Sequence, residues 1–148
     1  MEKKSLMARP VDLLSRREYS RRELMQKLKP HAESEEELLE VLERLGERAW
    51  QSDQRAAEQM TRVKGEKYGS LRLRQVMREK GIDAETIEQA LEGQDDFSRA
   101  QQVWQRKFGS QPATREERAK QVRFLAGRGF PAEVIRRVLS GAIDEYDD

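Results

Sequence analysis

Apolar side chains recur at three- and four-residue spacing along most of this chain, which is the pattern of short amphipathic helices. The clearest stripes are Leu38-Val41-Leu42-Leu45, Leu73-Val76-Met77 and Ile87-Ala90-Leu91. No run alternates apolar and polar residues as a half-buried strand does. The sequence therefore predicts an all-α protein.

Signals that start and stop helices place the element boundaries. Three segments have the capping-box spacing, in which a hydroxyl accepts from one free amide and a glutamate accepts from another. These segments are Ser20–Glu23, Ser34–Glu37 and Thr114–Glu117. We also expect Asp83 at a helix N-cap, Pro131 in a first helical turn, and glycines 81, 93, 109, 129 and 141 as left-handed residues that end helices. Helices are predicted at 10–18, 20–29, 34–46, 52–66, 69–80, 83–92, 96–108, 114–127 and 131–140.

A unit of about 48 residues recurs, and repeats of this length are typical of stacked supersecondary units. Gly81-Ile82 corresponds to Gly129-Phe130, and the correspondence continues through Ile87, Leu91 and Gly93 to Ile135, Leu139 and Gly141. A fainter copy relates Leu24 and Leu28 to Leu73 and Met77. We predict three tandem three-helix repeats at 10–48, 49–94 and 95–143, with a disordered segment at 1–9 and an acidic tail at 144–148.

Composition favours a thin stack of repeats over a globule with one large core. Only 36% of the 148 residues are hydrophobic and 39% are charged, against about 25% charged in typical domains. The net charge is only +1, but basic and acidic residues alternate in blocks. Basic blocks at 62–80 and 99–128 occupy corresponding places in two repeats, which favours either solvated helix faces or a strip that binds phosphates or an acidic protein surface.

The residues needed for catalysis or for holding a metal are scarce. The chain has no cysteine, and its single histidine, His31, follows Pro30 in a polar segment. Glu35, Glu36 and Glu37 are consecutive, so on a helix they point in different directions and are better read as a solvated helix start. No glycine-rich phosphate fingerprint follows a strand. We therefore expect no enzyme activity, no cofactor and no metal.

Several segments, in order and at matching spacing, resemble the RecX family. The stretch from Lys67-Tyr68-Gly69 through Lys80-Gly81-Ile82 is similar to that family's central motif. Ser20-Arg21-Arg22-Glu23-Leu24 is similar to its first repeat, and Arg106–Gly109 and Arg123–Phe130 are similar to its third. The resemblance spans residues 10–140. It implies an elongated, curved molecule of three helical repeats that binds the RecA–DNA filament and inhibits strand exchange, ATP hydrolysis and co-protease activity in DNA repair and the SOS response.

The residues that we expect to make the electrostatic contact with the filament lie in the two basic blocks. Tyr68 is the best candidate for stacking against a base, because basic residues flank it beside a glycine turn. The large aromatics in or beside the repeats are otherwise expected to pack between helices. The expected filament- and DNA-binding residues are Lys67, Tyr68, Arg72, Arg74, Arg78, Lys120 and Arg123.

Two other functions fit the same residues. A general nucleic-acid-binding helical protein would need no dedicated protein partner, and its DNA affinity would fall steeply with salt. A helical adaptor that binds only proteins would show no DNA affinity. We expect RecA filaments as the main partner, weaker electrostatic binding to single- and double-stranded DNA, a monomer, no membrane association and a cytoplasmic location.

Overall fold

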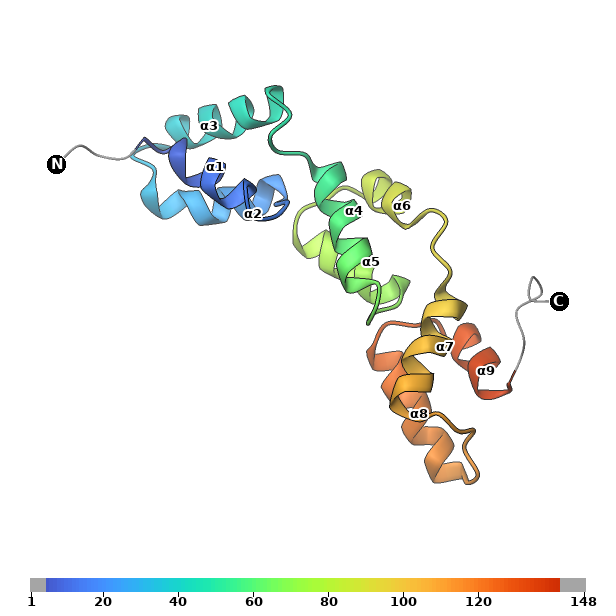
Figure 1. Cartoon of the computed structure of the whole chain (residues 1–148). Coiled ribbons are helices and arrows are strands. Elements are labelled where there is room, and N and C mark those ends of the chain that lie inside the picture. The colour runs from blue at the N-terminus through green and yellow to red at the C-terminus, as the bar shows by residue number, and fades with distance from the viewer. Residues whose placement is uncertain (1–4, 142–148) are drawn as a thin grey trace. The chain divides into compact units, whose positions relative to one another are not determined.

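The computed structural model describes residues 5–141, and every regular element in that range is helical (Figure 1). The helices are α1 Ala8–Leu14, α2 Arg21–Leu28, the short 3-10 helix η1 Lys29–His31, α3 Glu35–Glu47, α4 Asp53–Lys64, α5 Ser70–Glu79, α6 Ala84–Leu91, α7 Asp96–Lys107, α8 Arg115–Gly127 and α9 Ala132–Leu139. The prediction of an all-α protein built of three-helix repeats is confirmed. Its elongated, curved shape stays a prediction, and the acidic tail 144–148 lies outside the described residues.

Most predicted boundaries agree with the structure because the capping residues act locally. Ser20, Ser34 and Thr114 each accept a hydrogen bond from the backbone N–H three residues on. The N–H of Thr86 likewise donates to the Asp83 carboxylate, at 2.8 Å. Glycines 81, 93, 109, 129 and 141 all have positive φ, as expected of left-handed residues that end helices. Pro131 is the N-cap of α9 rather than a residue of its first turn.

The first helix differs from the prediction at both ends. The expected disorder through residue 9 is wrong for Ala8 and Arg9, which begin α1, and Leu6 is already buried. Pro10 fits inside the first turn because the amide it lacks would have no helical partner there. The helix ends at Leu14 instead of 18, because Tyr19 leaves the helical path to enter the core before the cap at Ser20.

Contacts between residues divide the described chain into two compact units. The first comprises residues up to Gln59 together with Met77–Ala90, and the second comprises Met60–Val76 with residues from Leu91 on. Helices α4 and α5 each contribute residues to both units, so the compact units do not coincide with single repeats.

Each unit has its own hydrophobic core. In the first unit, α2 packs against α3, and Leu24, Leu28 and Leu45 are almost fully buried. In the second, α7, α8 and α9 pack together around Leu125 and Phe130 (Figure 1). Burial of such side chains contributes about 1.5–3 kcal/mol each. Within residues 5–141, no helix combines the length and the apolar character that a membrane span requires.

Candidate functional site

The site is centred on two turns of the second unit that bind each other through their backbones. Gly69, just before α5, donates its N–H to the carbonyl oxygen of Arg128 at 2.8 Å, and Leu71 donates to the carbonyl of Gly129 at 3.1 Å. Only glycines allow this approach. A Cβ on Gly69 would lie 2.5 Å from the Gly129 oxygen, and one on Gly129 would lie 2.2 Å from Cβ of Arg72. The turn before α5 and the turn between α8 and α9 are therefore held in direct contact.

Cations and aromatic rings alternate across these two turns. The guanidinium groups of Arg72 and Arg128 each lie 5.8 Å from the centroid of the Tyr68 ring. Arg128 also lies 5.0 Å from the Phe124 ring, and the Lys107 ammonium lies 5.4 Å from that same ring. We call the series Arg72, Tyr68, Arg128, Phe124 and Lys107 the cation–aromatic ladder. Each contact contributes about 0.5–1 kcal/mol where solvent reaches it, so the rings favour these positions of the cations.

The arginines of the ladder are not neutralised by neighbouring acids. Among residues 5–141, no carboxylate forms an ion pair with Arg72 or Arg128, and the polar partner of Arg72 is the side-chain oxygen of Gln75, at 3.3 Å. Both arginines are half-buried. Partly desolvated guanidinium groups without a counter-ion are suited to bind an anion, and their planar forks match a phosphate or a carboxylate.

A largely buried polar network links the first residue of α5 to α7. Asp96 accepts hydrogen bonds from the backbone N–H of Ser70, at 3.0 Å, and from its hydroxyl, and it pairs with Arg99 at 2.6 Å. Arg99 is largely buried, and a Cβ on Gly65 would lie 2.8 Å from its Nη1. The acid that accepts hydrogen bonds from the first residue of α5 is thus already paired with Arg99.

The structure brings some of the predicted site residues together and separates others. Tyr68 and Arg72 belong to the ladder, and exposed Lys67 directly precedes Tyr68. Lys120 and Arg123 are exposed on α8, the helix that also carries Phe124. Neither of them is one of the ladder's cations, so their place in a binding surface stays a prediction.

The two remaining predicted residues, Arg74 and Arg78, are not part of the ladder. Arg74 is half-buried on α5 and already has an interaction of its own, so it is not a free cation. Arg78 is exposed in the last turn of α5 but belongs to the first compact unit. The ladder is built without either of them.

Sequence reasoning missed Arg128 and Lys107 and treated Phe124 only as a packing residue. Phe124 does pack, edge to face with Phe108 at a centroid distance of 5.4 Å, but it also carries two cations. The repeat offers a signal for Arg128, because the offset that relates Gly81 to Gly129 also relates Lys80 to Arg128. A basic residue therefore precedes the left-handed glycine in both repeats.

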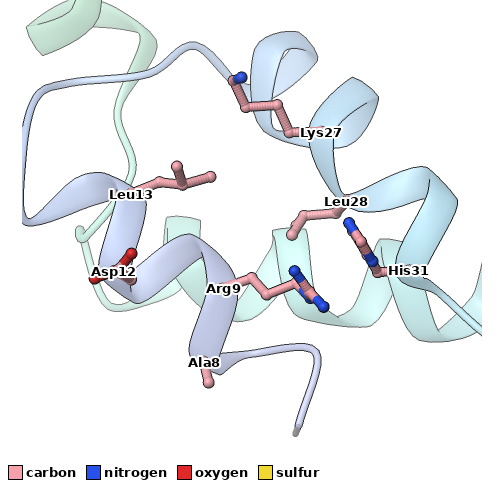
Figure 2. A pocket seen from close by; sticks show the side chains of 7 residues that line it. All are labelled: Ala8, Arg9, Asp12, Leu13, Lys27, Leu28 and His31. Carbon is pink, nitrogen blue, oxygen red and sulfur yellow. The ribbon is translucent and has the colours of Figure 1, made fainter.

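A hollow lies in the first unit, between α1 and the end of α2 (Figure 2). It is lined by Ala8, Arg9, Asp12, Leu13, Lys27, Leu28 and His31, and its volume is about 520 Å³. Figure 2 shows Arg9 and His31 pointing toward one another across it. Within residues 5–141, His31 forms no hydrogen bond or ion pair with a carboxylate, and no group of potential metal ligands gathers there, so the hollow has neither an oriented base nor a set of metal ligands. Glu35, Glu36 and Glu37 form the first turn of α3, and no three potential ligands gather within residues 5–141.

Comparison with known proteins identifies the family. A model of the RecX second three-helix domain matches residues 52–91, and a model of the third matches residues 94–139. A regulatory protein RecX from Chromobacterium violaceum is 54% identical over 149 residues, which cover 99% of this chain and 98% of that protein. The chain belongs to the RecX family. The RecX protein of Neisseria meningitidis serogroup C is 49% identical over 143 residues, covering 96% of this chain and 94% of its own.

Solved RecX structures share the fold. A crystal structure of a regulatory protein RecX superposes with a TM-score of 0.78 at 24% identity, covering 91% of this chain and 71% of that one. RecX from Lactobacillus salivarius superposes with a TM-score of 0.77 at 19% identity, covering 92% and 93%. The helical-repeat architecture is therefore the RecX fold, and the role of the chain is that of a regulatory protein of this family.

Proposed function

We propose that this chain regulates the RecA recombinase by binding along the RecA–DNA filament, where it inhibits strand exchange, ATP hydrolysis and co-protease activity. The observation that carries the proposal is the cation–aromatic ladder in a chain 54% identical to a regulatory protein RecX. A filament of protein and DNA presents both phosphates and acidic side chains. The unpaired arginines of the ladder suit either kind of anion.

The proposed role is regulation through binding, without catalysis. In enzymes, a nucleophile and its base lie within hydrogen-bond reach, or a metal activates water. Within the described residues, His31 is exposed and no group of potential metal ligands gathers. The features that do stand out are the exposed Lys107 and the half-buried Arg128 beside the Phe124 ring, and such pairs of cations and rings serve recognition.

A second candidate is a nucleic-acid-binding protein that acts without contacting RecA. The same ladder favours it, because arginines and aromatic rings together are a common surface for single strands. The two candidates differ in what limits inhibition. A filament regulator acts on a few filament sites, whereas a competitor for DNA has to cover the DNA.

The test is the ATPase rate of RecA on single-stranded DNA, measured while this protein is added well below the RecA concentration. Its affinity for the same DNA without RecA is measured in parallel at the same salt, since counterion release makes such affinities depend strongly on salt. Strong inhibition far below the concentration that covers the DNA supports direct action on the filament. Inhibition that begins only when the DNA is saturated would replace the proposal with the general binder.

A further inference from the structure

The chain contains two junctions of the same design, one in each compact unit. The offset that relates Leu24 to Leu73 also relates Tyr19 to Tyr68 and Ser20 to Gly69. In the first junction the Ser20 hydroxyl donates to the carbonyl oxygen of Lys80 at 2.7 Å. In the second, the Gly69 N–H donates to the carbonyl oxygen of Arg128, the counterpart of Lys80. Each junction thus joins the residue that precedes a helix to the basic residue of a Lys-Gly or Arg-Gly turn.

The first junction contains its own anion. Glu23 is 6% exposed, and its carboxylate lies 3.1 Å from the guanidinium of Arg17 and 3.4 Å from the ammonium of Lys80. It also accepts from the backbone N–H of Ser20 at 3.0 Å. Arg17 in turn lies 3.6 Å from the centroid of the Tyr19 ring, which is buried. A single carboxylate therefore joins two cations beside an aromatic ring.

The second junction has the cations and the ring but lacks the anion. The residue that corresponds to Glu23 is Arg72, so Arg72 and Arg128 both face the Tyr68 ring. Glu66 corresponds to Arg17, but it is exposed and forms no ion pair within residues 5–141. Two like charges that share one ring repel each other unless an anion lies between them. The second junction thus has a cation, Arg72, where the first has its carboxylate, and no acid of its own pairs with Arg72 or Arg128 in the described chain.

We propose that a phosphate group of a nucleic-acid backbone binds between Arg72 and Arg128 and supplies the negative charge that the Glu23 carboxylate supplies in the first junction. The proposal deepens the proposed function, on which it rests for the choice of nucleic acid as the ligand. It also couples binding to structure: a bound phosphate tightens the contact between the turn before α5 and the turn between α8 and α9. The protein then binds nucleic acid and stiffens this junction in the same step.

Phosphate is favoured over a protein carboxylate for two reasons. The guanidinium forks of Arg72 and Arg128 match the tetrahedral oxygens of a phosphate. The ladder also continues past Arg128 to Phe124 and Lys107, so three cations alternate with two aromatic rings. A nucleic-acid backbone presents one charge per nucleotide at regular intervals, and its bases supply flat faces for an aromatic ring.

The first experiment measures binding of a short single-stranded DNA oligonucleotide without RecA. Arg72→Gln should lower its affinity about tenfold and reduce the salt dependence by about one counterion, as expected when one phosphate contact is lost. Arg62→Gln is the matched control, because Arg62 is exposed on α4, has the same charge and lies outside the ladder. Arg72→Lys keeps the charge but loses the guanidinium fork, so its affinity should lie between those of Arg62→Gln and Arg72→Gln. This variant keeps the test valid if Arg72→Gln misfolds. Equal affinities of the Arg62→Gln and Arg72→Gln proteins would overturn the proposal.

The second experiment measures hydrogen exchange of the Gly69 and Leu71 amides, which donate across the junction. The oligonucleotide should slow their exchange several-fold in the natural chain. In Arg72→Glu, which restores a carboxylate at the position of Glu23, the two amides should exchange slowly from the start and not respond to DNA. The Ser20 amide of the first junction, bonded to Glu23, serves as the internal control and should not change. Unchanged exchange at Gly69 and Leu71 when DNA binds would contradict the coupling.

A polyglutamate peptide, added at the same concentration of negative charge as the DNA, tests whether the site prefers phosphate or protein carboxylates. If it protects the two amides as well as DNA does, the site belongs to an acidic protein surface and the nucleic-acid proposal is wrong. The RecA ATPase assay keeps this result separate from the proposed function. Loss of oligonucleotide binding in Arg72→Gln with inhibition of RecA retained would uphold the phosphate site and remove it from RecA regulation.

Discussion

Arg72 and Gly129 are in direct contact across the second junction: a Cβ on Gly129 would lie 2.2 Å from Cβ of Arg72. Gly129 also has φ of +91°, in the left-handed region that L residues with side chains rarely adopt. The cation–aromatic ladder therefore depends on a backbone position that only glycine satisfies. This contact leads to the first prediction.

Gly129→Ala should destabilise the second unit by about 2–4 kcal/mol, because it combines a left-handed alanine with a collision against Arg72. The matched control is Gly93→Ala. Gly93 has a similar φ of +80°, but a Cβ there would have nothing within 4 Å, so the cost should be only about 1 kcal/mol. Chemical denaturation of the two variants measures the difference. Equal losses of stability would mean that the close approach to Arg72 contributes nothing.

The buried pair of Asp96 and Arg99 supports the second prediction. Asp96→Asn should cost about 2 kcal/mol or more, since it leaves the charge of Arg99 buried without a counter-ion. Asp95→Asn is the control, because Asp95 is the N-cap of α7 and asparagine caps a helix about as well as aspartate, within a few tenths of a kcal/mol. The midpoint of thermal unfolding should be clearly lower for Asp96→Asn than for Asp95→Asn. Similar midpoints for both would show that the Asp96 charge does not stabilise the fold.

Acid should weaken the first junction through Glu23. Burial by itself would raise the pKa of Glu23, but hydrogen bonds from the Ser20 N–H and from Arg17, with the nearby charge of Lys80, outweigh it and lower that pKa. A carboxyl whose pKa is lower in the folded state stabilises the fold above its unfolded pKa of about 4.3, and this contribution is lost as the pH falls through the folded value.

The measurement is the free energy of unfolding of the natural chain and of Glu23→Gln between pH 2 and pH 7. The natural chain should be the more stable of the two at neutral pH. The difference between their free energies of unfolding should become smaller below a pH of about 4. The other carboxyl groups titrate in both proteins, so the comparison isolates Glu23. A gap that stays constant over this range would contradict an ionised Glu23 in the folded state.

Charge reversal on α8 tests the predicted residues outside the ladder. Lys120→Glu combined with Arg123→Glu should reduce inhibition of the RecA ATPase by about tenfold or more, because two attractive contacts become repulsive. Both side chains are exposed, so stability should change by less than about 0.5 kcal/mol per substitution. Lys27→Glu with Lys29→Glu, exposed residues of the first unit, makes the same charge change away from the ladder. Retained inhibition by a folded α8 variant would remove Lys120 and Arg123 from the binding surface.

Local chemistry explains which parts of the fold could be predicted. Ser20, Ser34 and Thr114 accept bonds from amides within their own helices, and the left-handed glycines end helices through their own φ, so short spacings predicted most boundaries. The first helix was misplaced because burial of Leu6 and Tyr19 depends on side chains distant in sequence.

The candidate site was predictable only in part, for the same reason. Tyr68 and Arg72 are close in sequence, and their shared turn was visible as a candidate. Arg128 joins them only because the Gly69 amide bonds to its carbonyl oxygen, a contact between residues far apart along the chain. Lys107 belongs to the ladder because it lies over the Phe124 ring. This contact depends on the packing of α7 against α8.

The sequence by itself determined the helices, their caps, the repeat and the RecX family, because each of these rests on residues within a few turns of one another or on the order of motifs. Only the tertiary structure decided which cations share a ring and which have an acid beside them. The sequence shows that Glu23 in the first repeat corresponds to Arg72 in the second, but it does not show how this difference changes the charge around the aromatic ring. The effect depends on the distance between turns, which is set by the backbone contacts of Gly69 and Gly129, and no local pattern encodes these contacts.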